Sequence, residues 1–432
     1  MRSSMPSPRN GSSKPKTRNS FRGGISLTSH RVGCGAPSPG CRFRGRALSE
    51  EVIVVAGIEP FRVDVPQEQV DDLRARLGGT RWPDELAGLG WSYGVPVGYA
   101  RGLAEYWGEG FDWRAAEKRL NSFAQFITRI DGQRVHFLHV RSAERDALPL
   151  IITHGWPGSV AEFLKIIEPL TDPVAHGGAA GDAFHIVAPS IPGFGFSGPT
   201  GETGWDIERV ARAWAVLMGR LRYERYGAQG GDSGSVISPM LGRLDAAHVV
   251  GVHVNGGLGF PTGDPAELEG LTPDELARLE QYRDLDRGGY AIIQSTRPQT
   301  LAFGLSDSPA AQLAWIVEKF KEWTDPAHEL PEDAVDIDQL LTDVSIYWFT
   351  GTAASSARLY KEGQQAWGST APYSGLPHGV AVFPGDGGVR RIAEREHNVV
   401  HWSEFDRGGH FAAMEAPDLL VEDVRTFFRP LR

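Results

Sequence analysis

The chain has 432 residues, enough for one large domain or two ordinary ones, and its 41% hydrophobic and 10% aromatic content supports a buried core. Its charge is uneven: residues 1–50 hold ten Lys or Arg and one acid, Glu50, and the remaining 34 basic and 53 acidic residues give the rest a net charge of −19. An acidic body of this kind excludes nucleic-acid binding by counterion release.

Residues 1–56 are expected to form a disordered basic tail, because they are rich in Ser, Gly and Pro and offer little to bury. The tail has no apolar signal region and no run long enough to span a bilayer, so we interpret it as a solvated extension or a start-site artefact. Both cysteines, Cys34 and Cys41, lie in it. The rest of the chain therefore has no disulfide, thiolate nucleophile or cysteine metal ligand, and a cytoplasmic location is the simplest expectation.

Residues 58–120 are predicted to form a meander wrapped on a larger body. Val70, Leu73 and Leu77 have helical spacing, with acids before arginines as in a capped amphipathic helix. Aromatic residues then follow closely: Trp91, Tyr93, Tyr106, Trp107, Phe111 and Trp113. Such a short, aromatic-rich segment favours packing on another core over a core of its own, and we prefer this interpretation to a ligand-binding aromatic box.

Strands and helices alternate in the next part of the chain. The predicted elements are a hairpin over 127–139 around Asp131-Gly132, a strand over 150–153 with a loop over 154–159, a helical pattern through Phe163 to Leu170, a strand over 184–188 and a helix over 206–221. This order is typical of a doubly wound parallel sheet, in which the functional loops gather at the carboxyl ends of the strands.

The stretch from Tyr226 to Ser235 contains an acid between two glycines, Gly230-x-Asp232-x-Gly234, directly after an apolar lead-in. A side chain can stand at the tip of a sharp strand-to-helix turn only if its neighbours two positions away are small, so the pattern predicts a nucleophile elbow with Asp232 as nucleophile. An ionised carboxylate needs no base for its own attack, and the ester that it forms must then be hydrolysed. The ten residues alone fit a glycine-rich turn with a capping Asp equally well.

Beyond the elbow, a strand over 249–254 precedes a mostly helical, acidic stretch to about Leu341, which includes a helix over 310–323. Strand 379–383 and a last helix over 416–428 complete the core, so the helical stretch is predicted to be a lid inserted after the nucleophile strand. The predicted organisation is an α/β-hydrolase fold with a tail (1–56), an N-terminal meander (57–125), a first core part (126–258), a helical lid (259–342), and the lid end with the second core part (343–432).

An α/β-hydrolase triad follows the chain order nucleophile, acid, histidine. Of the seven histidines after Asp232, His410 alone follows a Gly-Gly turn and precedes the terminal helix, which makes it the best candidate base. Asp386 directly follows a strand and is favoured as the acid over Asp406 and Glu404, which are close to His410 only in sequence.

The oxyanion hole needs two fixed backbone donors. Ser233, which follows the nucleophile, and Trp156, in the loop after the neighbouring strand, are the candidates, and Trp156 is also expected to wall the substrate cavity. Its bond to Pro157 is a candidate cis peptide.

The histidine pairs His136/His139 and His397/His401 lack the pattern of a zinc protease, so we interpret them as strand-edge or surface residues and expect no metal.

Several stretches together resemble the microsomal-type epoxide hydrolases of the α/β-hydrolase superfamily, from about residue 58 to the C-terminus and including that group's N-terminal meander. They are Pro60-Phe61, Arg81-Trp-Pro83, Asp112-Trp113, His154-Gly-Trp-Pro-Gly158, Gly230-Gly-Asp232 and Arg407-Gly-Gly-His-Phe411. The resemblance implies Asp232 as nucleophile, Asp386 as the charge partner and His410 as base. It also implies Tyr290 and Tyr360 as lid tyrosines that hydrogen-bond the epoxide oxygen, although from the residues alone Tyr282 fits as well as Tyr290.

Two departures from the family pattern stand out. Ser233 replaces the Trp that many relatives have, which predicts a roomier acyl side of the pocket. The basic tail replaces an apolar N-terminal anchor, which favours a soluble enzyme.

The expected reaction converts an epoxide and water to a vicinal diol. We expect no metal or organic cofactor and no nucleic-acid or membrane partner, and both a monomer and a homo-oligomer are compatible with the sequence. The alternatives are a haloalkane dehalogenase with the same nucleophile and a non-catalytic binding protein, which is expected to have lost a triad member.

Overall fold

The computed structural model describes residues 57–280, 285–364 and 371–432, so the predicted tail and Tyr282 lie outside the described residues. Within them the strands form one nine-stranded sheet in the order β1-β2-β3-β5-β4-β6-β7-β8-β9. The strands are β1 (Ile58–Phe61), β2 (Gln125–Ile130), β3 (Gln133–Val140), β4 (Leu148–Thr153), β5 (Phe184–Pro189), β6 (Tyr226–Gly231), β7 (Val249–Asn255), β8 (Ser374–Val382) and β9 (His397–Glu404). Pairing is antiparallel from β1 to β5 and parallel from β5 to β9, which confirms the predicted mostly parallel sheet.

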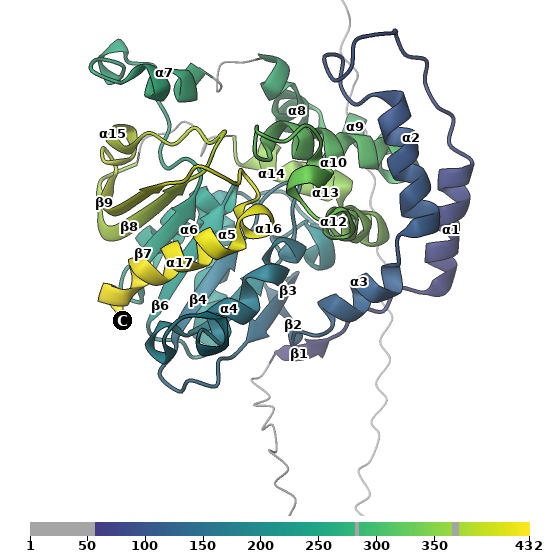
Figure 1. Cartoon of the computed structure of the whole chain (residues 1–432). Coiled ribbons are helices and arrows are strands. Elements are labelled where there is room, and N and C mark those ends of the chain that lie inside the picture. The colour runs from purple at the N-terminus through teal and green to yellow at the C-terminus, as the bar shows by residue number, and fades with distance from the viewer. Residues whose placement is uncertain (1–56, 281–284, 365–370) are drawn as a thin grey trace, which may run out of the picture. The chain divides into compact units, whose positions relative to one another are not determined.

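Helices cover both faces of this sheet (Figure 1), and the residues of β7 contact elements on each side. Successive strand residues point to opposite faces. A Cβ on Gly251 would lie 2.6 Å from Leu431 and 3.1 Å from Phe427, whereas the next residue, Val252, faces Gly242 on the other side. The covering elements are the 3-10 helix η2 (Val160–Lys165), α4 (Ile167–Thr171), α5 (Ile207–Arg220), α6 (Gly234–Leu244), α15 (Arg390–Ala393), α16 (Ala412–Glu415) and α17 (Pro417–Phe428).

Local sequence signals account for several element boundaries. The β2–β3 hairpin turns at Asp131 (φ 50°) and Gly132 (φ 79°), the left-handed pair that a two-residue hairpin requires. Asp206 caps α5 by accepting a hydrogen bond from Arg209 N at 2.8 Å. The edge strand β9 was not among the predicted elements.

The meander consists of β1, α1 (Gln67–Gly78), α2 (Val97–Glu105), the π-helix η1 (Tyr106–Gly110) and α3 (Trp113–Leu120). Its buried side chains, which include Leu73 and Trp107, belong to the same hydrophobic cluster as the sheet. The meander therefore has no separate core. Its aromatic residues form no common box, because Trp113 is buried while Tyr93 is 80% exposed.

The lid comprises α7 (Pro273–Glu280), α8 (Leu285–Thr296), α9 (Pro298–Asp307), α10 (Pro309–Trp323), α11 (Pro331–Ala334), α12 (Ile337–Thr350), α13 (Ala353–Ser356) and α14 (Arg358–Glu362). These helices gather above the carboxyl ends of the strands (Figure 1). The predicted lid boundary at residue 342 falls inside α12, and helical structure continues to Glu362. None of the described helices is long and apolar enough to cross a membrane.

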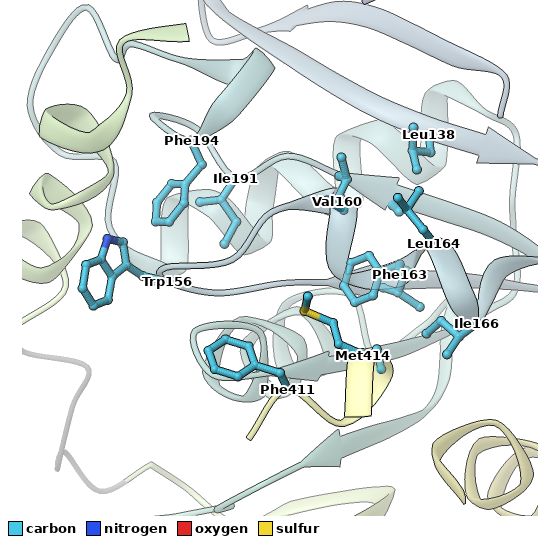
Figure 2. Packing of buried hydrophobic residues seen from close by; sticks show 14 of the residues in the cluster. Leu138, Trp156, Val160, Phe163, Leu164, Ile166, Ile191, Phe194, Phe411 and Met414 are labelled. Carbon is cyan, nitrogen blue, oxygen red and sulfur yellow. The ribbon is translucent and has the colours of Figure 1, made fainter. Parts of the chain in front are cut away.

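Apolar packing fixes the segment that follows the predicted oxyanion loop. Figure 2 shows Phe163 and Leu164 of η2 near Met414 of α16, and the two helices are in contact. Phe163 is 3% and Met414 1% exposed. Each fully buried side chain of this size contributes about 1.5–3 kcal/mol. The segment after Trp156 is therefore anchored to the C-terminal part of the chain.

Candidate active site

Asp232 stands at the tip of a tight turn between β6 and α6, as the glycine pattern predicts. Its φ is 50°, in the left-handed region that a residue with a Cβ adopts only at a cost. A Cβ on Gly230 would lie 2.4 Å from the Gly234 oxygen, and one on Gly234 would lie 2.0 Å from the Thr153 oxygen. Both glycines are thus required for β4, β6 and α6 to approach each other, and Asp232 is presented at the carboxyl end of the sheet.

Two backbone donors face the Asp232 carboxylate. Trp156 N donates a hydrogen bond to Oδ1 at 2.8 Å, and the backbone N–H of Ser233 donates to the same carboxylate. β4 pairs with β6 in parallel, which places the loop after Thr153 beside the elbow. The Trp156–Pro157 peptide is cis. The structure therefore brings together the two predicted oxyanion-hole residues, and Ser233 Oγ adds an unpredicted hydrogen bond to Oδ1 at 2.9 Å.

His410 lies against the other carboxylate oxygen, with Nε2 3.5 Å from Asp232 Oδ2. Burial acts to raise the pKa of Asp232, but His410 and the two N–H donors outweigh it, so that this pKa is lower than usual. Burial likewise acts to lower the pKa of His410, but Asp232, followed by Asp386 and Glu415, raises it above its ordinary value. The two shifts are in the direction that favours a carboxylate beside an imidazolium in the unreacted site.

Asp386 lies in the loop after β8, where the strand pattern placed it, and lines the same cavity as Asp232 and His410. Burial raises its pKa to about 6, although the charge of His410 opposes that rise. Its Oδ2 accepts a hydrogen bond from Phe383 N at 2.9 Å, and among the described residues no direct hydrogen bond joins it to His410. Asp386 therefore acts on His410 through its charge in this structure.

The other acids near His410 divide into two groups. Glu404 is half-exposed and forms an ion pair with Arg278 at 2.7 Å, and Asp406 is exposed, so neither is placed as the triad acid. Glu415, which the sequence analysis did not single out, raises the pKa of His410 and accepts hydrogen bonds from the backbone of Asp325 (2.8 Å) and Phe411 (2.9 Å). Glu415 lies in α16, five residues after His410, and this closeness in sequence was the signal that could have pointed to it.

Tyr290 of α8 and Tyr360 of α14 meet over the nucleophile, with ring centroids 5.7 Å apart. The two phenols influence each other's pKa, and both line the cavity that contains Asp232. Burial, and then the negative charges around them including Asp232, raise the pKa of both phenols above the ordinary value. Both side chains therefore stay protonated and can act as hydrogen-bond donors.

The prediction that Trp156 walls the cavity needs correction. Its side chain is 2% exposed, and its ring stacks on Tyr290 at 5.1 Å and meets Tyr360 edge-on at 5.9 Å. The two tyrosines cover the indole and line the cavity in its place. The Trp156 ring thus packs against both phenols, which lie between it and the cavity.

The cavity has a volume of about 490 Å³, large enough for a drug-sized organic molecule. Its wall combines the groups described above with Trp323, whose ring lies 5.0 Å from the His410 ring. Asp232, His410, Asp386, Tyr290 and Tyr360, from five separate segments of the chain, all line it.

A buried lysine behind the cavity was missed by the sequence analysis. Lys319 of α10 is 2% exposed, and its Nζ lies 3.0 Å from Glu318, 2.7 Å from Glu322 and 4.9 Å from the centre of the Tyr290 ring. Nothing in the amphipathic pattern of α10 marks Lys319 as buried, because its burial arises only when the helix packs on Tyr290.

The histidine pairs are not at this site. His136 is fully buried in the interior strand β3 and hydrogen-bonds Ser190 Oγ and Gln125 Oε1, each at 2.9 Å, so its predicted edge or surface position is wrong. His401 lies in the edge strand β9, 2.8 Å from Asp423. The part of the chain that the structure describes contains no group of three or more His, Cys, Asp or Glu residues that could hold a metal ion.

The fold and this site together define an α/β-hydrolase whose elbow carries an aspartate. Two family models match the chain: the N-terminal region of epoxide hydrolases over residues 58–163 and the α/β-hydrolase fold over residues 149–287. Epoxide hydrolase 1 of Sus scrofa is 36% identical, over 86% of this chain and 88% of that protein. A protein of Stigmatella aurantiaca that carries the provisional name of an epoxide hydrolase is 48% identical, over 87% and 86%.

Solved structures agree with these sequence matches. The juvenile hormone epoxide hydrolase of Bombyx mori superimposes with a TM-score of 0.79 at 31% identity, over 87% of this chain and 95% of that chain. The epoxide hydrolase of Aspergillus niger gives 0.76 at 33% identity, over 87% and 96%. The chain belongs to the epoxide hydrolase family, and its activity is the hydrolysis of epoxides.

Proposed function

We propose that the chain converts an epoxide and water to a vicinal diol through an ester on Asp232. The observation that carries this assignment is the arrangement of its two carboxylate oxygens, with Oδ1 held by Trp156 N at 2.8 Å and Oδ2 facing His410 Nε2 at 3.5 Å. One oxygen is thereby fixed and the other faces the cavity. The low pKa of Asp232 keeps the carboxylate ionised for attack on a ring carbon.

In the first half-reaction, Tyr290 and Tyr360 donate hydrogen bonds to the epoxide oxygen while Asp232 attacks. The carbon–oxygen bond of the ring breaks as the new ester bond forms. The alkoxide takes a proton from one of the two phenols, which is reprotonated from solvent, so that the product is a hydroxyalkyl ester. In the second half-reaction, His410 removes a proton from water, and the hydroxide attacks the ester carbonyl of Asp232. The N–H groups of Trp156 and Ser233 stabilise the oxyanion, and collapse releases the diol.

The tyrosines give a test that separates epoxide opening from dehalogenation, since a halide leaves as a stable anion without a proton. We expect Tyr290→Phe and Tyr360→Phe each to slow pre-steady-state ester formation from styrene oxide by about 10- to 1000-fold, in the range of general acid catalysis, and the double variant to be nearly inactive. Rapid-quench measurement of the ester gives the rates. Tyr373→Phe, at an exposed tyrosine (60%), is the control.

Equal rates of ester formation in wild type and both single variants would contradict the proposed role of the two tyrosines. Turnover of a bromoalkane at the rate of the epoxide would favour the dehalogenase alternative.

The charges around His410 predict different acid limits for the two half-reactions. In the free site Asp232 raises the pKa of His410, whereas in the ester Asp232 is neutral and burial still acts to lower it. His410 must be unprotonated to accept a proton from water. We therefore expect ester hydrolysis to remain fast down to a lower pH than the one at which His410 titrates in the free enzyme.

This comparison needs the pH dependence of ester decay in single turnovers and an NMR titration of the His410 ring in the free enzyme. If ester decay already slows at a pH at or above the pKa of His410 in the free enzyme, the proposed charge coupling is contradicted.

We also propose a cytoplasmic location, supported by the restriction of both cysteines to residues 1–56.

A further inference from the structure

Lid helix α12 carries a row of polar residues that faces inward. Gln339, Asp343 and Tyr347 follow one another at intervals of four, so they share one face of the helix. They are only 8%, 0% and 0% exposed. Buried polar side chains are costly unless they have partners, so this row needs a structural reason.

The row faces the segment that follows the oxyanion loop. Tyr347 Oη donates a hydrogen bond to the Gly158 oxygen at 2.7 Å, and Gln339 Nε2 donates one to the Ala161 oxygen at 2.9 Å. Between them Asp343 lies near Ser159, and neither of its buried carboxyl oxygens has a hydrogen-bond partner among the described residues. One helical face is therefore hydrogen-bonded to both ends of the segment 158–161, which starts only two positions after Trp156.

The carboxyl group of Glu162 lies directly against the same segment, at Gly158. A Cβ on Gly158 would lie 1.3 Å from Glu162 Oε1, so the carboxyl group occupies the place of a side chain there. On the other side of the loop, a Cβ on Gly155 would lie 2.0 Å from Asp232 Oδ1. The loop thus passes between Glu162 and the nucleophile. A side chain at position 155 would clash with Asp232, and one at position 158 would displace the Glu162 carboxyl group.

Glu162 and Asp343 form no ion pair with any of the described residues. Burial raises the pKa of Asp343 to about 8, opposed by Ser159, and burial followed by the charges of Asp343 and Asp232 raises the pKa of Glu162 well above its usual range. Tyr347, on the same face, also stays protonated because burial raises its pKa. Glu162 and Asp343 are thus shifted toward the uncharged form, whereas the pKa of Asp232 is shifted toward the ionised form.

We propose that Gln339, Asp343 and Tyr347 of α12, together with Glu162, are positioning residues that act as an uncharged clamp on the oxyanion loop and keep Trp156 N aimed at Asp232 Oδ1. The inference rests on the roles proposed above for Asp232 and Trp156. It assigns the lid a second task besides carrying the tyrosines, since α12 connects the lid directly to the oxyanion hole.

The clamp should matter mainly in the second half-reaction. The Trp156 N–H bond stabilises the Asp232 carboxylate before attack, so loosening that bond does not weaken the nucleophile. In ester hydrolysis the same N–H must stabilise a new oxyanion, where one lost donor costs about 100- to 1000-fold. A displaced donor should slow hydrolysis of the ester while leaving its formation nearly unchanged.

Tyr347→Phe tests this split, because it removes the hydroxyl that holds Gly158 and keeps the ring. With styrene oxide, we expect rapid-quench kinetics and intact-protein mass spectrometry to show ester hydrolysis slowed by about 10- to 100-fold and ester formation changed by less than about threefold. Gln339→Met should give the same split with a smaller effect, and it serves if the first variant does not fold.

Two further variants test the uncharged state. Asp343→Asn and Glu162→Gln keep the shape of a neutral carboxyl group, so both should retain ester formation and hydrolysis within about threefold of wild type at pH 7. Loss of more than about tenfold in either half-reaction would show that an ionised carboxylate is needed, and would overturn the uncharged clamp.

Ser345→Ala is the matched control. Ser345 lies on the same helix, is fully buried, and accepts a hydrogen bond from Trp107 Nε1 of the meander at 2.8 Å. This variant loses a comparable hydrogen bond that does not reach the loop, so it should hydrolyse the ester at the wild-type rate. The same slow hydrolysis in Ser345→Ala, or wild-type hydrolysis in both Tyr347→Phe and Gln339→Met, would overturn the proposal. Absence of any ester in all variants, wild type included, would instead contradict the role of Asp232.

Discussion

Replacement of Asp232 by asparagine is expected to abolish diol formation, with a loss on the order of 10⁴- to 10⁶-fold, as when a member of a catalytic triad is removed. An amide is a far weaker nucleophile than a carboxylate, and neither oxyanion donors nor His410 can restore the missing charge. The fold should persist, because Asn also adopts the left-handed conformation (φ 50°) that the elbow imposes. Initial rates of diol formation from styrene oxide, measured on freshly purified protein, test this expectation.

Two controls complete the Asp232→Asn experiment. Asp206→Asn keeps the N-cap of α5 outside the cavity and should retain full activity. Intact-protein mass spectrometry excludes slow deamidation back to aspartate. More than about 1% residual activity in a sample free of deamidation would be incompatible with Asp232 as nucleophile, since removal of a triad member costs far more than 100-fold.

The second large effect is expected for His410→Gln, which should stop ester hydrolysis while still allowing the ester to form. The imidazole acts on water and not on the epoxide, so loss of the base should slow hydrolysis by about 10²- to 10⁴-fold. Without the imidazolium, burial raises the pKa of Asp232, and the incubation is therefore best done at about pH 8, well above the usual carboxyl pKa. The enzyme should then gain the mass of one substrate molecule.

The double variant Asp232→Asn/His410→Gln should show no such adduct, which assigns the modification to Asp232. Peptide mapping of the single variant locates the ester on the elbow peptide. If long incubation of His410→Gln leaves the mass unchanged and diol still appears, another group acts as the base. In that case Glu415, which accepts the Phe411 N–H beside His410, becomes the first residue to examine.

The contacts of Asp386 refine the prediction that it partners His410. It lines the cavity and responds to the charge of His410, yet its direct hydrogen bond is to Phe383 N at 2.9 Å. A strand-end position in the sequence locates such a residue at the correct edge of the sheet. It does not give the direction of the side chain, which depends on the conformation of the loop after β8, where Asp386 and Phe383 hydrogen-bond each other.

Features that depend on near neighbours in the chain could be predicted from the amino-acid sequence. The glycines around Asp232 predicted the elbow because the turn excludes a Cβ at both positions, and Asp131-Gly132 predicted the hairpin because both residues take a positive φ. Alternating strand and helix patterns predicted the succession of these elements along the chain. The family resemblance supplied Tyr290 and Tyr360, which the structure brings together over Asp232.

Tertiary structure alone decided the features that depend on distance through space. Trp156 faces the tyrosines and not the cavity, Lys319 is buried against Tyr290, and Tyr347 reaches Gly158 across 189 positions of sequence. Each of these side chains is polar or amphipathic, so its local pattern is compatible with solvent as well as with the interior. Burial and pKa shifts arise only when separate segments pack together, and the polar face of α12 acquires its partners in this way.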